Sequence, residues 1–504
     1  MRNGLVFGLA VLVLAIGGDW AVALNPTADE LALAQEWRKG HAGAEASGLP
    51  FSFGYGGKSS SEFIAGWEKK HSSRELDQNR TEYTDMYRET QSGLEVRCVT
   101  VAYKDFPTVE WTVYFRNGGK TDTGILEHIQ ALDVTWQRPE NCEFILHSTV
   151  GDGYGDIYGP RQQVMPAGAA SEFAPVGGRS CSGQFPYFKL EWQSQGVVLA
   201  IGWPGQWAAS FTRDSGMGLR VQAGQELTHF KLAPREEVRT PLIVLQFWKG
   251  DAMAAQNVWR KWMMEHNLPR PLGPQMAVCT SNSHGLFGIS EENQRQWLAR
   301  YLEEDMKPEY WWVDLGWFEV DLTKNVNVFN ARYDPDPVRF PNGLWPFSDY
   351  LHSLGIKLIA WFEPEHYYPG PGNWIVENRP EWLLKAPPGH EAEINQGLPL
   401  KNRVVLNLGN PEALKWVTDN VDRVIKEQGI DLYRHDFNIE PLIFWRGNDA
   451  EDRQGITENK YVSGFLAYFD GLLQRHPGML IDNCASGGRR NDVESLRRSV
   501  QLLR

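Results

Sequence analysis

Apolar and polar residues follow two different rhythms along this chain, and the change comes near residue 250. Before it, apolar residues alternate with polar ones at every second position, as in Leu94–Val101 and Val109–Phe115. Comparable runs follow at 185–192, 197–203, 217–222, 226–232 and 241–248, with Gly, Pro, Asn and Asp between them. Many short strands of this kind predict an antiparallel β-sandwich. Ahead of them, Leu31–Lys39 predicts a short helix, and the glycine- and serine-rich stretch Ser52–Ser59 predicts a loop.

After residue 250 the pattern changes to apolar runs that alternate with helical stretches. Residues 251–266 predict a linker helix, which Pro269 and Pro271 end. Buried strands are predicted at 276–279, 310–313, 356–361, 430–433 and 479–482. Between them lie predicted helices at 290–304, 344–354, 411–428 and 458–475. This alternation predicts a parallel α/β sheet, with a (β/α)8 barrel as the leading architecture and a doubly wound sheet as its competitor.

Polar side chains follow each of the predicted parallel strands. The polar ends are Cys279–His284, Asp314–Trp317, Glu363–His366, Arg434–Asn438 and Asn483–Gly488. In a parallel barrel these ends meet at one rim, where catalytic residues collect. Asp436 stands where its strand becomes loop; a lone acid there is more often a cap than a catalyst. Five converging polar ends favour a functional site instead.

The predicted barrel is incomplete. Five strands are followed by residues 499–503, which resemble the start of a sixth, and the sequence ends at Arg504. A closed barrel needs eight strands. We therefore expect a C-terminally truncated barrel.

Composition narrows the classes of partner. The formal net charge of −13 argues against a nucleic-acid backbone. The 21 Trp, 17 Tyr and 23 Phe fit either stacking on sugar faces or a large aromatic β core. No G-x-G-x-x-G or P-loop motif follows the predicted strands, and the five cysteines are not spaced as metal ligands, so no cofactor or metal is expected. An odd number of cysteines implies no disulfide framework.

The first 23 residues predict a signal peptide. Arg2 gives the positive start, Leu5–Ile16 is an apolar run too short to span a bilayer comfortably, and Ala21–Ala23 is a small-x-small cleavage site. The predicted location is secreted or periplasmic, and an uncleaved N-terminal anchor is the alternative. The whole pattern then predicts a signal peptide over 1–23, an all-β sandwich domain over 24–250, a linker helix over 251–272 and the truncated barrel over 273–504.

A neutral, aromatic-rich barrel mouth that carries acids suits glycoside hydrolysis. Retaining glycosidases use two carboxyl groups, one as nucleophile and one as acid/base. Asp436 is the candidate nucleophile, because the charge of Arg434 beside it favours the carboxylate. His435 points to the opposite face of an extended strand, so a packed or supporting role is expected for it.

Five motifs together resemble, in order, the α-galactosidases of glycoside hydrolase family 36, the melibiase type. They are Trp311–Phe318, Trp361–Glu365, Arg403–Glu412, Asp436–Asn438 and Cys484–Gly488. The stretches Gly178–Ser180 and Gly202–Trp207 also resemble that family's N-terminal β-supersandwich. The resemblance implies an N-terminal supersandwich, an incomplete TIM barrel and hydrolysis of terminal α-galactosidic or related α-glycosidic bonds.

The resemblance also implies roles for single residues. Asp436 matches the family's nucleophile. The acid/base of the family lies in a Ser-Asp motif that would follow Arg504, and Asp492 matches a different aspartate. The matched sugar-contacting positions are Asp314, Trp317, Trp361, Arg403, Arg434, Asn438, Cys484 and Gly487.

Three departures from the family pattern place the glycone in question. The second of two adjacent aspartates is Leu315 here, the lysine before the nucleophile is Arg434, and the third glycine after the cysteine is Arg489. Loss of a carboxylate that grips the sugar removes charge-assisted hydrogen bonds, so the glycone need not be galactose. Arginine keeps the charge of lysine but not its geometry.

Three functions remain open from the sequence. A retaining α-glycosidase similar to α-galactosidases is the first, a non-catalytic carbohydrate-binding protein or inactive fragment is the second, and a transglycosylase is the third. The expected partner is an oligosaccharide or glycoside substrate, not nucleic acid or, for the mature chain, a membrane. A homo-oligomer is compatible with the sequence.

Overall fold

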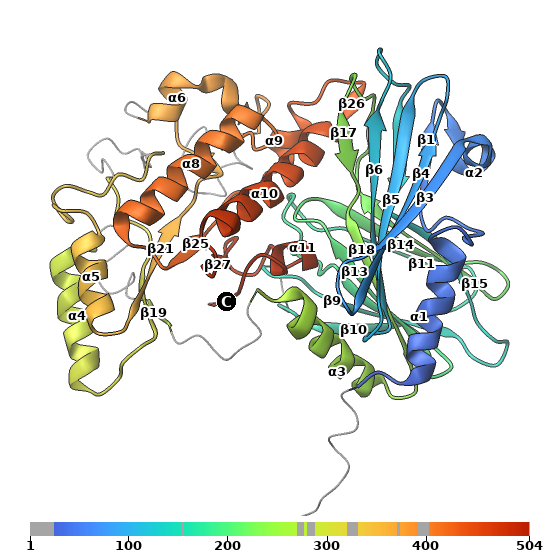
Figure 1. Ribbon diagram of the computed structural model, residues 1–504, viewed down its shortest axis with the longest axis horizontal. Coiled ribbons are helices and arrows are strands. Elements are labelled where there is room, and N and C mark those ends of the chain that lie inside the picture. The colour runs from blue at the N-terminus through green and yellow to red at the C-terminus, as the bar shows by residue number, and fades with distance from the viewer. Residues whose placement is uncertain are drawn as a thin grey trace, which may run out of the picture.

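The computed structural model describes residues 25–153, 156–269, 277–279, 288–319, 331–369, 373–390 and 403–502. The predicted signal peptide and the predicted polar strand end at 280–284 lie outside these residues. The described chain forms an antiparallel β region and an α/β region that pack side by side (Figure 1). No helix in these ranges is long and apolar enough to span a membrane.

The β region is built from a large sheet and smaller ones. The large sheet runs in the order β10 (Pro160–Met165), β9 (Phe144–Thr149), β12 (Tyr187–Trp192), β13 (Gln195–Gly202), β18 (Leu242–Lys249), β6 (Thr108–Asn117), β5 (Leu94–Tyr103), β4 (Arg80–Arg88) and β3 (Glu68–Glu75), with β17 (Glu237–Arg239) on β6. A four-stranded sheet contains β11 (Ala170–Phe173), β14 (Trp207–Arg213), β15 (Gly218–Gln225) and β8 (Leu132–Gln137). All of these pairings are antiparallel, as predicted.

The predicted loop at Ser52–Ser59 is a hairpin. β1 (Ser52–Tyr55) pairs with β2 (Lys58–Ser59), and Gly56 and Gly57 take φ of 58° and 78° at the turn between them. Glycine is what this left-handed backbone favours, so the prediction of a loop was wrong because a tight turn and its flanking strands share one glycine-rich stretch. The short α2 (Ser60–Phe63) and η2 (Ile64–Gly66) follow directly.

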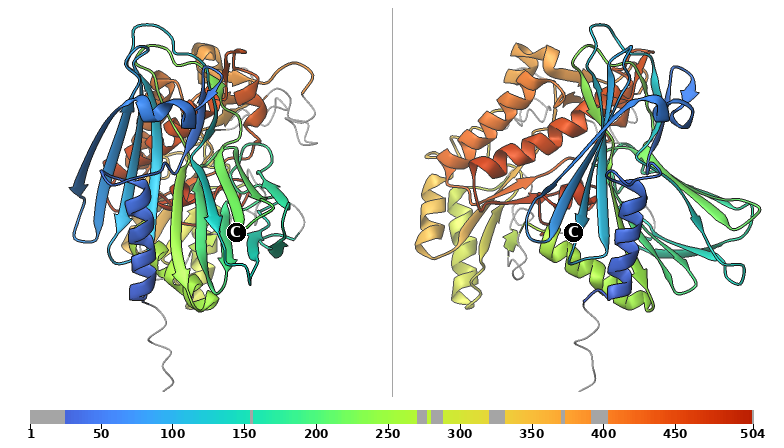
Figure 2. Two further views of the ribbon diagram at one scale, coloured as in Figure 1. Left: turned by 90° about the vertical axis from the view of Figure 1, so that its right-hand side faces the viewer. Right: turned by 45° about the vertical axis from the view of Figure 1, so that its right-hand side comes forward.

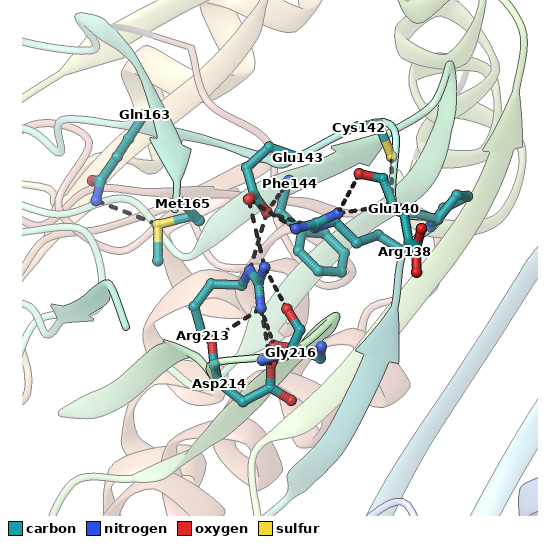
Figure 3. A network of polar contacts seen from close by, with 12 residues as sticks. Arg138, Glu140, Cys142, Glu143, Phe144, Gln163, Met165, Arg213, Asp214 and Gly216 are labelled. Atoms are coloured by element: carbon teal, nitrogen blue, oxygen red, sulfur yellow. Dashed lines mark hydrogen bonds and ion pairs between the residues drawn. The ribbon is translucent and has the colours of Figure 1, made fainter. Parts of the chain in front are cut away.

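A buried arginine joins the two sheets of the sandwich (Figure 3). Arg213, at the end of β14, is 2% exposed and donates from Nε to Glu143 Oε1 at 3.0 Å, just before β9. It also donates from Nη1 to Asp214 Oδ1 at 2.9 Å and to Gly218 O at 2.9 Å, and from Nη2 to Gly216 O at 3.0 Å. Nη1 also donates to Asp214 O at 3.2 Å, so the guanidinium meets two carboxylates and three carbonyl oxygens, which offsets the cost of burying its charge.

Helices flank the β region. α1 (Ala28–His41) begins with a capping box in which Glu30 N donates to Thr27 Oγ1 and Thr27 N donates to Glu30 Oε2. The predicted linker helix is α3 (Ala252–Trp262), capped by Asp251, and it continues as a π-helical turn over Met263–Asn267. Trp259 and Trp262 of α3 are buried against the large sheet.

Five parallel strands form the sheet of the α/β region. Their spatial order is β19 (Ala277–Cys279), β20 (Tyr310–Val313), β21 (Lys357–Phe362), β25 (Leu432–His435) and β27 (Leu480–Asn483), which is also their order along the chain. Such singly wound order is that of a (β/α) barrel, whereas a doubly wound sheet reverses direction. Val500 forms an isolated parallel bridge to Asp482, at the place where the sequence predicts the start of a sixth strand.

The helices between these strands match the predicted ones closely. They are α4 (Glu291–Glu303), α5 (Trp345–Ser353), α8 (Pro411–Gln428) and α10 (Ile456–Arg475), with the shorter α6 (Trp374–Asn378), η6 (Pro380–Trp382), α9 (Leu442–Arg446) and α11 (Val493–Leu496). Inserted after β21 is a small antiparallel sheet of β22 (His366–Tyr367), β24 (Val404–Leu406) and β23 (Leu383–Lys385).

The two regions share structure. A five-stranded sheet contains β2, β1, β7 (Leu126–Gln130), β16 (His229–Phe230) and β26 (Arg453–Gln454), so its last strand comes from the α/β region. The long helix α10 meets the β region in the right-hand view of Figure 2 and contacts β17, and α11 contacts β13. One apolar core also runs through both regions, and nine of the largest fully buried side chains in the described ranges are tryptophans. Much of the aromatic content therefore belongs to the core.

Candidate active site

Asp436 lies at the end of β25, as the sequence predicts, and is 7% exposed. The carboxyl ends of the neighbouring strands carry Asp314 after β20, Glu363 after β21 and Cys484 after β27. Because these strands are parallel and adjacent, their polar ends lie along one edge of the sheet. The site is therefore assembled from segments more than 150 residues apart.

The carboxylate of Asp436 accepts several hydrogen bonds. Trp361 Nε1 donates to Oδ2 at 3.1 Å, and the backbone N–H groups of Phe437 and Ser486 donate to Oδ1 at 2.8 and 3.3 Å. Burial raises the pKa of Asp436, but the charge of Arg434 and hydrogen bonds from Asn438, Trp361 and Cys484 outweigh it, so its pKa lies below its ordinary value. The carboxylate is held ionised.

Arg434 is held by a second carboxylate. Its Nη1 donates to Asp482 Oδ2, on the adjacent strand β27, where the two residues are paired in register. Its guanidinium also lies 4.0 Å from the ring centroid of Trp312. Burial lowers the pKa of Arg434, but Asp482, Cys484, Asp436 and Asp314 together raise it above its ordinary value. A permanent positive charge therefore lies beside Asp436.

Asn438 and Arg403 are linked through the loop after β25. Arg403 Nη1 donates to Asn438 O at 2.8 Å, and its guanidinium lies 5.1 Å from the Tyr368 ring centroid. Asn438 Oδ1 accepts from Ser486 Oγ at 2.7 Å, and Asn438 N donates to Glu363 Oε1. Both predicted sugar-contacting residues thus belong to the network around Asp436.

The two predicted tryptophans lie in different environments. Trp361 is 3% exposed and reaches Asp436 directly, while Trp317 is fully buried and donates from Nε1 to Trp361 O at 2.9 Å. Trp317 thus supports Trp361 from the core side, and its direct contact with a sugar stays a prediction.

The loop after β27 brings in the β region. Gly487 has φ of 102°, and a Cβ there would lie 2.7 Å from Asp152 Oδ2. Asp152 itself accepts from Gly488 N and lies between β9 and β10. Gly487 N donates to Cys484 Sγ at 3.4 Å. Glycine is therefore required at 487 by both backbone conformation and space.

His435 packs beneath the site, as predicted for it. Its Nε2 lies 2.6 Å from Glu365 Oε1 and its Nδ1 2.6 Å from Tyr433 Oη. Arg490 donates to both carboxylate oxygens of Glu365, at 3.1 and 2.7 Å, and stacks on the rings of Phe437 and Phe465. Burial raises the pKa of Glu365, but Arg490 and His435 outweigh it and bring it to about 2.

Asp492 has a structural role. It caps α11 through Ser495 and accepts from Ser180 Oγ at 2.9 Å, across the boundary with the β region. It is fully buried, and burial raises its pKa. That Asp492 is not the acid/base stays a prediction.

One group of possible metal ligands occurs in the described ranges. Asp105, Glu265 and His266 have ligand atoms within 4.8 Å of one another. They come from the β5–β6 turn and the π-helical turn after α3, not from the strand ends around Asp436. The residues around Asp436 are carboxylates, arginines and amides that already bind one another.

Comparisons with known proteins point to one family. The family model described as Melibiase matches residues 291–502. An α-galactosidase of Lactobacillus acidophilus is 22% identical over 411 residues, which cover 80% of this chain and 54% of that protein. An α-galactosidase of Escherichia coli is 29% identical over 188 residues, or 37% of this chain and 24% of that protein.

The α/β region of the chain is therefore similar to the melibiase family. Among solved structures, the family 36 α-galactosidase AgaA of Geobacillus stearothermophilus has a TM-score of 0.71 at 18% identity, covering 90% of this chain and 64% of that one. The α-galactosidase of Lactobacillus brevis has a TM-score of 0.72 at 16% identity, covering 91% and 63%. At this identity the structures establish a shared fold, and the chain spans about half the length of the L. acidophilus protein.

Sequence reasoning missed the residues that hold the predicted site residues in place. Asp482 was seen only as the end of a strand, yet it is the carboxylate that binds Arg434. Ser486 was seen only as part of the Cys484–Gly488 motif, and Asp152 and Arg179 were seen only as parts of the β region. An alternating β pattern carries no signal for a side chain that reaches into another region.

Proposed function

We propose that this chain hydrolyses terminal α-galactosides or related α-glycosides by a retaining mechanism in which Asp436 is the nucleophile. The observation that carries the proposal is the state of Asp436: a buried carboxylate at a strand end, with its pKa lowered by Arg434 and its orientation held by Trp361 and Ser486. A nucleophilic carboxylate must be ionised and held in a fixed orientation, and Asp436 meets both conditions.

The similarity of residues 291–502 to the melibiase family supports the proposed substrate class. Structures of the Geobacillus stearothermophilus α-galactosidase include complexes with stachyose and raffinose. For the present chain, Leu315 stands where an acidic neighbour of Asp314 is expected, and it packs partly against the core. We therefore extend the proposed glycone from galactose to related sugars.

In the proposed first step, Asp436 attacks the anomeric carbon, the bond to the leaving-group oxygen breaks, and a glycosyl ester forms on Asp436. Water then cleaves that ester and restores the carboxylate with overall retention. Arg434 keeps the carboxylate charged in the free enzyme. Trp361 and the Ser486 N–H fix its direction.

The test is Asp436→Ala and Asp436→Asn, assayed with aryl α-galactosides, other aryl α-glycosides and glycosyl fluorides, whose good leaving groups need no acid assistance. We expect kcat/KM to fall by at least about 10³-fold, as for loss of a nucleophile. Added azide should restore cleavage by Asp436→Ala and yield the β-glycosyl azide, because azide attacks from the face that Asp436 has vacated.

The matched control is Asp431→Asn. Asp431 lies before the same strand at its opposite end, where its Oδ2 accepts from Leu358 N at 2.8 Å and meets His352. The activity of the Asp431→Asn variant should equal that of the wild type. Undiminished cleavage by Asp436→Ala would remove Asp436 as nucleophile. Sugar binding in calorimetry with no turnover by the wild type would favour a carbohydrate-binding protein instead.

The location is proposed from the sequence alone. The apolar N-terminal stretch favours export to a secreted or periplasmic location. Fractionation of cells that express the chain, with N-terminal sequencing of the product, tests this; an N-terminus at Met1 in the cytoplasmic fraction would contradict it.

A further inference from the structure

Arg179 is a buried charge that crosses from the β region into the α/β region. Its side chain is 1% exposed and lies between β11 and β12 in the chain. Nη1 donates to Ser486 Oγ at 3.0 Å and to Phe437 O at 3.3 Å, and Nη2 pairs with Glu440 Oε1 at 3.5 Å. These partners all belong to the two loops that surround Asp436.

Ser486 is the link between Arg179 and Asp436. Its backbone N–H donates to Asp436 Oδ1, and its hydroxyl donates to Asn438 Oδ1 while accepting from Arg179. Its φ is 53°, a left-handed conformation that is unfavourable for a non-glycine residue and persists only where its surroundings impose it. The contacts of its hydroxyl and its N–H bond to Asp436 surround it in this conformation.

The segment that carries Arg179 is itself fixed. Gly178 N donates to Gln206 Oε1 at 3.0 Å, Trp207 Nε1 donates to Ser180 O at 2.7 Å, and Ser180 Oγ donates to Asp492. Gly178 has φ of 92°, and a Cβ there would lie 2.9 Å from Leu442 N and from the Trp445 ring. The backbone on either side of Arg179 is therefore held in place by hydrogen bonds and packing, as the positioning of a functional group requires.

We propose that Arg179 positions the Asp436 carboxylate through Ser486, so that the β region is a working part of the active site. Arg179 fixes the hydroxyl of Ser486 and the carbonyl of Phe437. Ser486 in turn holds its backbone N–H against Asp436 and its hydroxyl against Asn438. Arg179 is a positioning residue, because its hydrogen bonds to Phe437 and Ser486 fix the two loops that hold the carboxylate.

The inference rests on the proposed function, so its test has a kinetic arm and a structural arm. In the kinetic arm, Arg179→Met should lower kcat by about 10–100-fold with KM changed less than about threefold, because a misplaced nucleophile loses transition-state stabilisation and not ground-state binding. Arg179→Lys should recover part of the loss, since it keeps the charge and one donor.

A double-mutant cycle tests the route through Ser486. Ser486→Ala removes the hydroxyl and leaves the backbone N–H, so it breaks the same link as Arg179→Met. The combined variant should be no slower than the slower single variant by more than about twofold. If the fold-losses in kcat of the two single variants multiply in the combined variant, Arg179 does not act through Ser486 and the proposal is overturned. Arg220→Met, which removes an exposed arginine of the β region paired with Asp133, is the control and should keep wild-type kcat.

In the structural arm, crystal structures of wild type, Arg179→Met and Ser486→Ala are compared whether or not the wild type turns over. We expect loss of the Ser486 N–H contact with Asp436 and a Ser486 φ that leaves the left-handed region. An unchanged Ser486 and Asp436 in Arg179→Met would overturn the inference. An inactive wild type with the expected displacement would overturn the proposed function alone. If Arg179→Met does not fold, the kinetic and the crystallographic measurements are made on Arg179→Lys and Ser486→Ala.

Discussion

Two buried arginines of the β region, Arg213 and Arg179, meet their surroundings in different ways. Arg213 binds Glu143, Asp214 and the carbonyls of a hairpin, all within the β region (Figure 3). Arg179 binds Phe437, Ser486 and Glu440, all within the α/β region. Both arginines are buried to the same degree, yet Arg213 stabilises the β region and Arg179 holds loops of the candidate site. The difference lies in the residues that each one binds.

The same contrast holds for two buried glutamates. Glu365, beneath the site, faces Arg490 and His435 and is ionised. Glu458 of α10 faces only uncharged donors among its hydrogen-bond partners, Trp203 Nε1 and Gln206 N, each at 2.8 Å. Burial raises the pKa of Glu458 to about 8, although those two hydrogen bonds lower it. A buried glutamate therefore stays ionised where an arginine pairs with it, and is protonated near neutral pH where its hydrogen-bond donors are uncharged.

Loss of Arg213 should have the largest effect on stability. Arg213→Met removes the cation paired with Asp214, leaves Glu143 with Arg138 alone and leaves three carbonyl oxygens without this donor. Unfolding in urea should therefore show a loss of stability of about 3–5 kcal/mol. The kcat per folded molecule should stay at the wild-type value, in contrast to Arg179→Met. A loss of kcat with unchanged stability would reverse the roles given to the two arginines.

Glu365→Gln should cost nearly as much, and its cost should depend on pH. At pH 7 it leaves Arg490 without its carboxylate, at about 3 kcal/mol of stability. The folded-state pKa of about 2 lies below the ordinary 4.5, so this contribution is present above pH 4.5 and is lost as pH falls towards 2. The difference between variant and wild type in chemical unfolding should therefore shrink below pH 4.5. A difference that is constant from pH 7 to pH 3 would contradict an ionised Glu365.

Glu458→Gln should show the smallest effect, with the opposite dependence on pH. The folded-state pKa of about 8 lies above the ordinary 4.5, so the wild type is stabilised below pH 4.5 and loses this stability as pH rises through 8. Between pH 7 and pH 8 the wild type should lose about 1 kcal/mol relative to the variant, whose side chain does not titrate. Parallel stability curves over this interval would show that Glu458 is already ionised at neutral pH.

Much of the fold follows from local pattern. The five parallel strands and the helices between them were predicted within a few residues, because each strand begins as a short apolar run and helices such as α8 have one apolar face. Strands β3 and β4 were missed. β3 is exposed along its whole length and reads as polar, so its sequence carries no alternation to detect.

The sequence by itself determined where the polar residues of the candidate site stand: Asp314, Asp436, Asn438 and Cys484 each follow an apolar run that can only be a buried strand. That information is local, because burial sets the pattern of each strand. Only the tertiary structure decided which side chains hold these polar residues in place. Asp482 on Arg434, Ser486 on Asp436 and Arg179 on Ser486 are contacts between segments 48, 50 and 307 residues apart. No spacing in a single sequence encodes such pairs, because they depend on how strand ends, loops and a second region pack together.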